Sequence, residues 1–357
     1  MVRTVDLRVE RTLAQLQSRR SAEEAVFKAG RWFQAQLGDE GAKRWCKQNG
    51  VTRSVSEGLN TAGGALVPDD ITDTIIALRD RRGVFRGSAS VLPMKGDTKS
   101  APRRTGGLTA SFTAEGVALS ESSLTFDSIG LVAKKLTTSC KISAELSEDA
   151  APDVGAYFVT EAAYAFASKE DDCGFNGDGT STYGGIRGLT KLLIDGSHNA
   201  GKVTASSGHN TFALLDNTDL TSLMAALPSY ALPGAKWFVS NFGYATTFCR
   251  LAASAGGIVT TQVNGVTVPS FLGFPVQITP VLPQVGSSLA GSIMITFGDL
   301  SMAATLGDRR QATVNFTTER FIDTDQIGVF GSERVDIVVH DLGDNTTAGP
   351  IVGLVGG

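Results

Sequence analysis

The chain has 357 residues, of which 42% are hydrophobic and 19% are charged, and its formal net charge is −4. This length suits one large domain or two linked lobes, and the hydrophobic content argues against general disorder. No apolar run approaches the roughly 18 residues that a membrane span needs, and the N-terminal residues lack the apolar centre of a secretory signal. The charged fraction lies below the roughly 25% that is usual for soluble domains, which favours a surface that contacts other protein chains.

The cysteines argue against zinc and redox sites. Cys46, Cys140, Cys173 and Cys249 show neither a CxxC spacing nor a neighbouring histidine. We therefore expect buried, reduced thiols in a cytosol-like environment.

The first part of the chain is basic. Residues 1–55 hold eleven Lys and Arg against six Asp and Glu, a net charge of +5. Two interpretations stay open: an arm that contacts nucleic acid or an acidic partner, and a solvated helix face. Ser21 and Glu24 have the spacing of a capping box that opens a helix, and a second short helix follows from Asp39. The polar, Gly-rich stretch after it predicts a linker, so we expect residues 1–65 to form a helical arm and linker.

The next unit combines a helix with a ribbon. A helix is predicted from Asp69 or Asp70 to Arg82, whereas residues 93–130 show no helical period. Prolines, a Gly-Gly pair and alternating stretches in that segment are typical of a long β-hairpin. A two-stranded ribbon with few large apolar residues is marginal in water, so we expect it to lie on another body, such as a neighbouring subunit.

The longest predicted helix runs from Pro152 to Phe175, and its inner positions are mostly Ala. Pro152 suits a first helical turn, and glycines supply the stop. Near its end, Glu170, Asp171 and Asp172 are adjacent in sequence and therefore point in different directions around the helix. We expect them to be salt-bridge partners rather than an acid/base pair.

From Asn210 onward, helical and strand patterns alternate. Asn264-Gly265 between β-branched runs predicts a type I′ hairpin. The last residues, TTAGPIVGLVGG, are expected to be flexible or weakly docked. The expected helices are Thr218–Leu227 and Tyr244–Ala253, and the expected strands are Leu131–Ile142, Lys236–Ser240, Val259–Val263, Val266–Val268, Phe271–Ile278, Ser292–Phe297, Ala312–Thr318 and Arg334–Val339.

None of the motifs that carry chemistry is complete. The Gly-rich residues 177–185 lack the Lys of a Walker loop, and Thr182 stands where a dinucleotide fingerprint needs its third Gly. A calcium-loop pattern that starts at Asp323 has Arg334 instead of Glu at its twelfth position. We therefore expect no catalytic residue, no cofactor and no metal. No ligand spacing occurs among the three histidines, His198, His209 and His340.

Arginines gather before and within the ribbon, and two roles stay open for them. They suit phosphate binding, and they equally suit ion pairs with acidic residues on other copies of the chain, such as Glu148 and Asp149. The arginines are Arg79, Arg81, Arg82, Arg86, Arg103 and Arg104.

Seven stretches, taken in their order and spacing, resemble the major capsid protein family of tailed bacteriophages, whose fold is called HK-ninety-seven-like. The resemblance covers residues 61–342, and no single stretch is specific by itself. The stretches are AGGALVP at 62–68, FTAEGVALS at 112–120, SAELSEDA at 143–150, KEDDCGFNGDGT at 169–180, GGIRGL at 184–189, FLGFPVQIT at 271–279 and ITFGDLSMAATLGDRR at 295–310.

This resemblance implies an α+β fold with an arm, an extended loop and two domains. The implied parts are the N-terminal arm and linker at 1–65, the peripheral domain at 66–92, 131–185 and 301–341 with a spine helix at 152–175, the extended loop at 93–130, the axial domain at 186–300 and a C-terminal tail at 342–357.

The function that the resemblance implies is self-assembly. Copies are expected to form hexamers and pentamers, which close into an icosahedral head around double-stranded DNA. Portal and scaffolding proteins and a decoration protein are further expected partners, DNA is expected to be contacted non-specifically, and no membrane is expected. The expected location is the virion, after assembly in the host bacterial cytoplasm. The residues expected at contacts between copies are Arg81, Arg82, Arg103, Arg104, Phe112, Glu115, Glu148 and Asp149.

Two features of some family members are expected to be absent. The roughly sixty residues before the GG-LVP stretch are short for a cleavable scaffolding domain, so we expect an uncleaved helical arm. Lys95 and Lys99 are available for an intersubunit cross-link, but Gln311 and Thr318 stand where Asn and Glu are needed. We therefore expect no autocatalytic cross-link.

Two other classes remain as alternatives. An encapsulin-like nanocompartment shares the fold and encloses enzyme cargo instead of a genome; the basic arm and the long extended loop favour the phage interpretation. A cytosolic enzyme would be a monomer or a small oligomer, which sedimentation separates from a closed shell.

Overall fold

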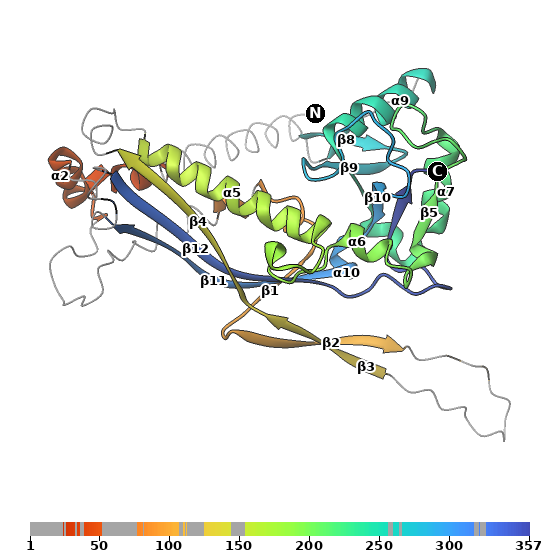
Figure 1. Cartoon of the computed structure of the whole chain (residues 1–357), viewed down its shortest axis with the longest axis horizontal. Helices are drawn as coiled ribbons and strands as arrows, with labels where there is room; N and C mark the ends of the chain where they lie inside the picture. Colours follow the sequence, from red (N-terminus) through yellow and green to blue (C-terminus); the bar gives the residue numbers. More distant parts are fainter. Residues whose placement is uncertain are drawn as a thin grey trace, which may run out of the picture.

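A computed structural model describes residues 24–51, 77–106, 125–143, 154–317 and 326–357, with gaps at 25, 33, 36–38, 81, 256–259 and 264–265, and the single residues 110, 112 and 321. In this part the chain is α+β. A long four-stranded sheet carries helix α5 (Val154–Asn176), a two-stranded hairpin projects from the sheet, and a separate lobe holds a seven-stranded sheet (Figure 1). Within the described residues, no helix is long and apolar enough to cross a membrane.

The four-stranded sheet has the order β1-β11-β12-β4. Strand β1 runs parallel to β11, and the other neighbours are antiparallel. The sequence predicted only the second halves of β11 and β12, because glycines and charged residues interrupt the first halves. The strands are β1 (Ser90–Pro93), β11 (Ala304–Thr317), β12 (Gln326–Val339) and β4 (Lys134–Ser143).

Helix α5 confirms the predicted long helix, although residues 152 and 153 lie outside the described part. Its buried residues include Val159, Ala163 and Phe166, which share a core with Val329 of β12. The small Ala side chains on this face allow close approach between helix and sheet.

The basic N-terminal segment packs against the N-terminal half of α5. Residues 24, 26–32, 34 and 35 are helical, and helix α2 (Glu40–Gln48) follows with Asp39 as its N-cap. Trp32, Ala42 and Cys46 are buried in the same core as Val159. The described part of the expected arm is therefore a packed pair of helices, as Figure 1 shows at the end opposite the lobe.

The predicted hairpin is confirmed in its strands. β2 (Thr98–Gly106) pairs antiparallel with β3 (Thr125–Val132), with a bulge between Arg104 and Gly106. Leu131 and Val132 belong to this hairpin, whereas the sequence assigned them to the next strand. Strand β4 begins at Lys134, after the break at Ala133.

The separate lobe is built on a sheet of order β5-β13-β10-β6-β9-β8-β7. Its core is aromatic: the Trp237 ring lies 4.2 Å from the Phe297 ring and 5.4 Å from the Phe248 ring, centroid to centroid. The strands are β5 (Lys202–Thr204), β13 (Ile351–Val355), β10 (Ile293–Gly298), β6 (Lys236–Val239), β9 (Phe274–Ile278), β8 (Val266–Phe271) and β7 (Thr260–Val263).

The prediction that the C-terminal residues form a flexible or weakly docked tail is wrong. All five residues of β13 are buried, and the strand lies between β10, to which it is antiparallel, and β5, to which it is parallel. The run IVGLV is short and flanked by glycines, so its sequence resembles a loose end. Its apolar side chains instead complete the core of the lobe.

Two other predictions in this lobe need correction. The expected strand Phe271–Ile278 is two strands, because Leu272 and Gly273 adopt positive φ angles of 48° and 85° and turn the chain. The expected helix at Tyr244–Ala253 starts as a π-helical turn over Tyr244–Cys249 and continues as α9 (Arg250–Ala255). The hairpin of β7 and β8 is confirmed by the pair Val263↔Val266, although its two turn residues lie outside the described part.

Short helical segments connect these strands. Helix α7 (Asn217–Ala226) confirms the predicted helix at Thr218–Leu227. The short named α-helices of the described part are α6 (Leu189–Leu193), α7, α8 (Asn241–Gly243) and α10 (Leu300–Ala303), and residues 77–80 and 82 are helical too. The 3-10 turns there are Ser181–Tyr183, Asn199–Gly201 and Ser229–Gly234.

Candidate functional site: a buried ion-pair cluster and a projecting hairpin

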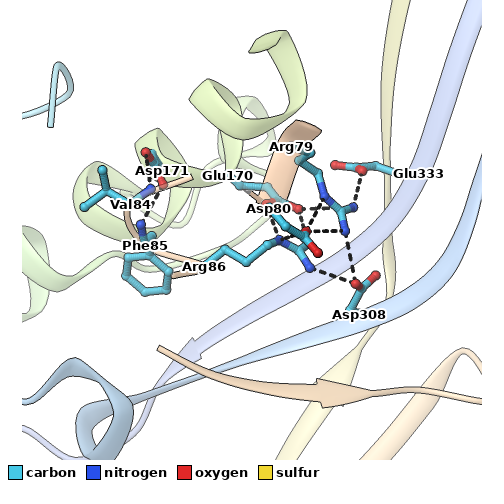
Figure 2. Close-up of polar contacts among 9 residues, drawn as sticks. All are labelled: Arg79, Asp80, Val84, Phe85, Arg86, Glu170, Asp171, Asp308 and Glu333. Atoms are coloured by element: carbon cyan, nitrogen blue, oxygen red, sulfur yellow. Dashed lines mark hydrogen bonds and ion pairs between the residues drawn. The ribbon is translucent and has the colours of Figure 1, made fainter. Parts of the chain in front are cut away.

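Five buried charged residues meet where the segment before β1, helix α5 and strands β11 and β12 come together (Figure 2). None is more than 5% exposed. We call this set the ion-pair cluster, and its members are Arg79, Arg86, Glu170, Asp308 and Glu333.

The geometry of the cluster is that of strong, charge-assisted hydrogen bonds. Arg86 holds Glu170 with two bonds, 2.9 Å from Nε and 2.5 Å from Nη2, and it reaches Asp308 at 2.7 Å from Nη1. Arg79 donates to Glu333 at 2.6 Å and to Asp308 at 3.2 Å. The cluster therefore fastens the segment before β1 to the long helix and to two strands.

Burial and neighbouring charges shift the pKa values of the residues in this cluster. Burial and the nearby charge of Glu170 raise the pKa of Glu333 to about 8, although Arg79 acts in the opposite direction. For Arg86, burial opposes the charged form, but its bonds to Glu170 and Asp308 outweigh burial and raise the pKa. Both arginines are therefore charged at any physiological pH.

The acidic residues at the end of α5 have different partners. Glu170 belongs to the cluster, and Asp172 pairs with Lys169 at 3.0 Å, as the sequence predicted. Asp171 forms no ion pair with the described residues; instead it accepts hydrogen bonds from the backbone N–H groups of Val84 and Phe85. Burial raises the pKa of Asp171 to about 6, against the effect of these two bonds.

The sequence left two roles open for the arginines, and the structure decides against both for Arg79 and Arg86. Their guanidinium groups are buried and paired with acids of the same chain, so their charges are compensated without phosphate or another subunit. The predicted strands began after Asp308 and Glu333, so no strand pattern marked these two acids as buried. Sequence alone does not show which arginine each of these acids meets.

Polar contacts hold the root of the hairpin to the four-stranded sheet. Asp97, just before β2, pairs with Arg309 of β11 and, at 2.6 Å, with Arg334 of β12. Asp336 of β12 accepts from the backbone N–H of Val132 at 2.8 Å and from Lys134 at 3.0 Å. Both strands of the hairpin are therefore attached to the sheet.

Apolar side chains of the hairpin face water both at this root and beyond it. Phe126 is 65% exposed and Val132 is 51% exposed, whereas Ile129 and Leu131 are buried near the sheet. The isolated residue Phe112, from the segment between the two strands, is fully exposed. Figure 1 shows the two strands pointing away from the rest of the chain. An exposed apolar ribbon of this kind is typical of a surface that another protein covers.

The other residues expected at contacts between copies are only partly described. Arg82 is exposed, and its guanidinium lies 5.6 Å from the centre of the Tyr164 ring. Arg103 donates to the backbone oxygen of His340 and lies 3.6 Å from Asp127. Outside the described part lie Arg81, Glu115, Glu148, Asp149, Thr318 and the side chains of Arg104 and Gln311.

The two lysines considered for a cross-link both lie near the hairpin root. Lys95 is exposed, and Lys99 donates to the backbone oxygen of Pro93 at 2.7 Å. The absence of a cross-link stays a prediction.

The Gly-rich loop after α5 is a closed turn. Gly179, Gly184 and Gly185 have positive φ angles, and the Asp178 carboxylate accepts from the Thr180 N–H at 2.9 Å. The backbone bond from Gly188 to Gly177 joins its two ends. This geometry confirms a structural turn, as the sequence predicted.

His209, Asp216 and Asp219 place three potential ligand atoms within 4.8 Å of one another. Both oxygens of the Asp219 carboxylate are already engaged, one by Ser206 and the other by His209 at 2.6 Å and by the Asp216 N–H. The bond from the Asp216 N–H to Asp219 and the reciprocal bond from the Asp219 N–H to the Asp216 carboxylate form the capping box at the start of α7. The group is therefore a helix cap. The sequence did not predict that His209 and Asp219 lie together.

The prediction that all four cysteine thiols are buried is partly wrong. Cys46 and Cys173 are buried and free, and burial raises the pKa of both. Cys140, on the outer strand β4, is exposed. Cys249 is half-buried.

Comparisons with known proteins extend over most of the chain. A family model described as "Phage capsid family" matches residues 63–342. The chain is 27% identical over 316 residues to the major capsid protein of Klebsiella oxytoca phage phiKO2, and the match covers 84% of this chain and 71% of that protein.

Solved structures match the fold. The capsid of a native GTA particle superposes with a TM-score of 0.55 at 18% identity, covering 84% of this chain and 95% of the other. A structure from Mycobacterium phage Adephagia gives a TM-score of 0.52 at 16% identity, covering 87% and 97%.

Proposed function

The chain belongs to the phage capsid family and acts as a phage major capsid protein; we propose that its copies associate as hexamers and pentamers, which close into an icosahedral head around double-stranded DNA. The observation that carries this proposal is the projecting hairpin with Phe126 and Val132 exposed to water. Among the described residues, nothing in the same subunit covers these two side chains. A second copy supplies such a surface.

The parts of the fold receive roles on the same basis. The four-stranded sheet with α5 is the peripheral domain, expected at 66–92, 131–185 and 301–341. The hairpin is the extended loop, expected at 93–130, and Leu131 and Val132 join it in this proposal because β3 ends at Val132. The seven-stranded lobe is the axial domain at 186–300. Residues 342–357 join the axial lobe in this proposal, because β13 is part of its sheet.

The role we propose is structural rather than catalytic. Portal and scaffolding proteins and a decoration protein are the proposed further partners, with non-specific contact to DNA. The proposed location is the virion, after assembly in the host bacterial cytoplasm. The encapsulin-like alternative shares the shell architecture, but the relatives named above are phage and GTA capsids, which favours the phage role.

Burial of the hairpin supplies part of the assembly free energy. Covering one large apolar side chain such as Phe126 contributes about 1.5–3 kcal/mol per contact. Because each subunit both gives and receives a hairpin in a closed shell, this contribution recurs at every subunit.

The test combines sedimentation with negative-stain microscopy of the expressed chain. We expect closed shells from the wild type and mainly small oligomers from Phe126→Ser at the same concentration, with unchanged far-UV circular dichroism. The matched control is Phe126→Leu, which keeps an apolar side chain and should assemble. A wild type that stays monomeric, or shells of normal yield from Phe126→Ser, would contradict the proposal.

A further inference from the structure

The packed pair of N-terminal helices, here called the helix pair, carries positive charge for which the sequence left two roles open. Its described part, within residues 24–51, holds five Lys and Arg against three Asp and Glu. The preceding residues 1–23 hold five basic residues against three acidic ones, so they do not neutralise the pair. Residues 1–55 have a net charge of +5 and the rest of the chain has −9, which together give the −4 of the whole chain. Positive charge is therefore concentrated in the segment that contains the helix pair.

The basic side chains of the helix pair lie on the sides of the two helices that face away from the core. Trp32 in the first helix and Cys46 in α2 are buried in the core beside α5. At the surface, Phe27 of the first helix and Trp45 of α2 meet edge to face, with 5.6 Å between their ring centroids. We call the basic residues of these outer sides the basic face. Its members are the exposed Lys28, Lys43, Arg44 and Lys47 and the half-buried Arg31.

Most cations of the basic face lack an acidic partner. Lys43 pairs with Glu40 at 2.8 Å, and the other four form no ion pair with the residues that the structure describes. Arg31 lies over the Phe27 ring instead, 5.4 Å from its centre, and its Nε is buried without a hydrogen-bond acceptor there. The positive charge of this face is therefore not compensated within the described part of the chain, so a partner with negative charge is attracted to it.

The composition of the basic face fits DNA better than it fits the surface of another subunit. Protein–protein interfaces have an apolar core from which charged residues are depleted. Among the described residues between 24 and 51, Phe27 is the one exposed large apolar side chain, and Lys28 and Arg31 follow it on the same helix. Duplex DNA needs no apolar core, because Lys and Arg bind its phosphates through charge and release condensed counterions.

We propose that the basic face binds the phosphate backbone of packaged double-stranded DNA without reading its sequence. This inference rests on the proposed function, which places DNA inside the head but assigns the contact to no part of the chain. The helix pair then faces the interior of the shell. The family model begins at residue 63, so this contact belongs to a part of the chain that the match does not include.

The direct test is ultraviolet cross-linking of DNA-filled heads, followed by mass spectrometry of the peptides that stay attached to DNA. We expect attached peptides from residues 24–51, where the rings of Phe27 and Trp45 lie beside the cations. Attachment only through other parts of the chain, or no attachment, overturns the inference and leaves the capsid function intact. Particles that never enclose DNA overturn the proposed function, and this inference with it.

The second test is the double variant Lys28→Gln with Lys47→Gln, measured on unassembled subunits by fluorescence anisotropy of a short double-stranded DNA at several salt concentrations. We expect the slope of log K against log salt concentration to decrease in magnitude by about 2, and the affinity at about 0.1 M salt to fall about 10- to 100-fold, because each lost phosphate contact removes about 0.9 from the slope. The matched control is Lys135→Gln with Lys191→Gln, which removes two exposed lysines elsewhere and should leave the slope unchanged. Equal slopes for the wild type and the Lys28/Lys47 variant, or wild-type subunits that do not bind DNA, contradict the inference.

An acidic surface of a neighbouring subunit is the alternative partner for the basic face, and the same variants distinguish it. We expect both double variants to form empty shells at the wild-type subunit concentration, measured by sedimentation without DNA. Unchanged far-UV circular dichroism shows that their helices stay folded. Impaired assembly of the Lys28/Lys47 variant without DNA, together with an unchanged salt slope, assigns the basic face to a contact between subunits and overturns the inference.

Discussion

Gly174, near the end of α5, is one of the positions where the long helix contacts the segment before β1. A Cβ atom at this residue would lie 2.5 Å from the ring of Phe85, which is fully buried and packs edge-on against Phe175. Glycine is therefore required by close packing, although alanine is the better helix former by about 1 kcal/mol.

We predict that Gly174→Ala lowers the free energy of unfolding by about 1–3 kcal/mol, because overpacking outweighs the gain in helix propensity. Denaturant unfolding of the unassembled subunit measures this change. The matched control is Gly130→Ala in β3, where a Cβ atom would meet nothing within 4 Å. Equal stability of Gly174→Ala and the wild type would show that Phe85 moves aside freely.

Glu333 gives the ion-pair cluster a dependence on pH. Its pKa is raised from 4.5 to about 8, so between these values the folded chain binds more protons at this site than the unfolded chain does. The stability that this group contributes is therefore fully present below pH 4.5. It falls as the pH rises above 4.5 and is lost once the pH has passed 8.

We predict that Glu333→Gln, which keeps a neutral side chain at every pH, gains stability relative to the wild type as the pH rises from 6 to 8. The difference in unfolding free energy between the two proteins should move by roughly 1–2 kcal/mol over this range, given about 1.4 kcal/mol per pKa unit. Urea unfolding at several pH values measures it, with Glu161→Gln as the control. Parallel curves for wild type and Glu333→Gln would contradict a raised pKa.

At the scale of elements, β13 decides how the lobe is closed. Leu354 is fully buried in the core that contains Trp237, although it stands three residues from the end of the chain. We predict that Leu354→Ala destabilises the lobe by about 2–5 kcal/mol, whereas Val285→Ala, at a half-exposed position, changes stability by less than about 0.5 kcal/mol. Thermal unfolding followed by near-UV circular dichroism measures both. A weakly docked tail would make the two variants equal.

The sequence predicted elements better than it predicted their neighbours. The long helix, α7, β6 and both hairpins follow from local periodicity and turn residues, which act over a few positions. The first halves of β11 and β12 were missed because Gly307, Asp308 and Glu333 look like strand breakers in isolation. In the fold, Gly307 leaves room for Met94, and the two acids find buried arginines. Such compensation depends on residues more than 200 positions away, which local patterns do not show.

The same limit applies to the candidate sites. The hairpin was predicted, together with the need to cover it, because a ribbon without large core residues has an evident shortage of apolar contacts. The ion-pair cluster was not predicted, because its arginines and acids have equivalent alternatives along the sequence. The family resemblance supplied the order of domains, which neither composition nor periodicity contains.

For the whole molecule, assembly depends on the direction in which the hairpin is presented. The ion-pair cluster is buried and joins the body into one unit, whereas the hairpin is joined to that unit through its root. Asp97 is a central part of this root, and its side chain is 64% exposed. A hairpin held in one direction loses less conformational entropy when a neighbour binds it.

We predict that Asp97→Ala loosens the hairpin without unfolding the subunit, because exposed ion pairs contribute only about 0–1 kcal/mol each. Amide hydrogen exchange of residues 98–106 and 125–132 should speed up, while exchange in β11 and β12 stays unchanged. The subunit concentration needed for assembly should rise several-fold, roughly as the lost preorganisation requires. Glu40→Ala is the matched control, since it breaks another exposed pair, with Lys43, at the far end of the molecule. If Asp97→Ala exchanges and assembles as Glu40→Ala does, the hairpin is held by its backbone contacts alone, and the pairs of Asp97 with Arg309 and Arg334 do not set its direction.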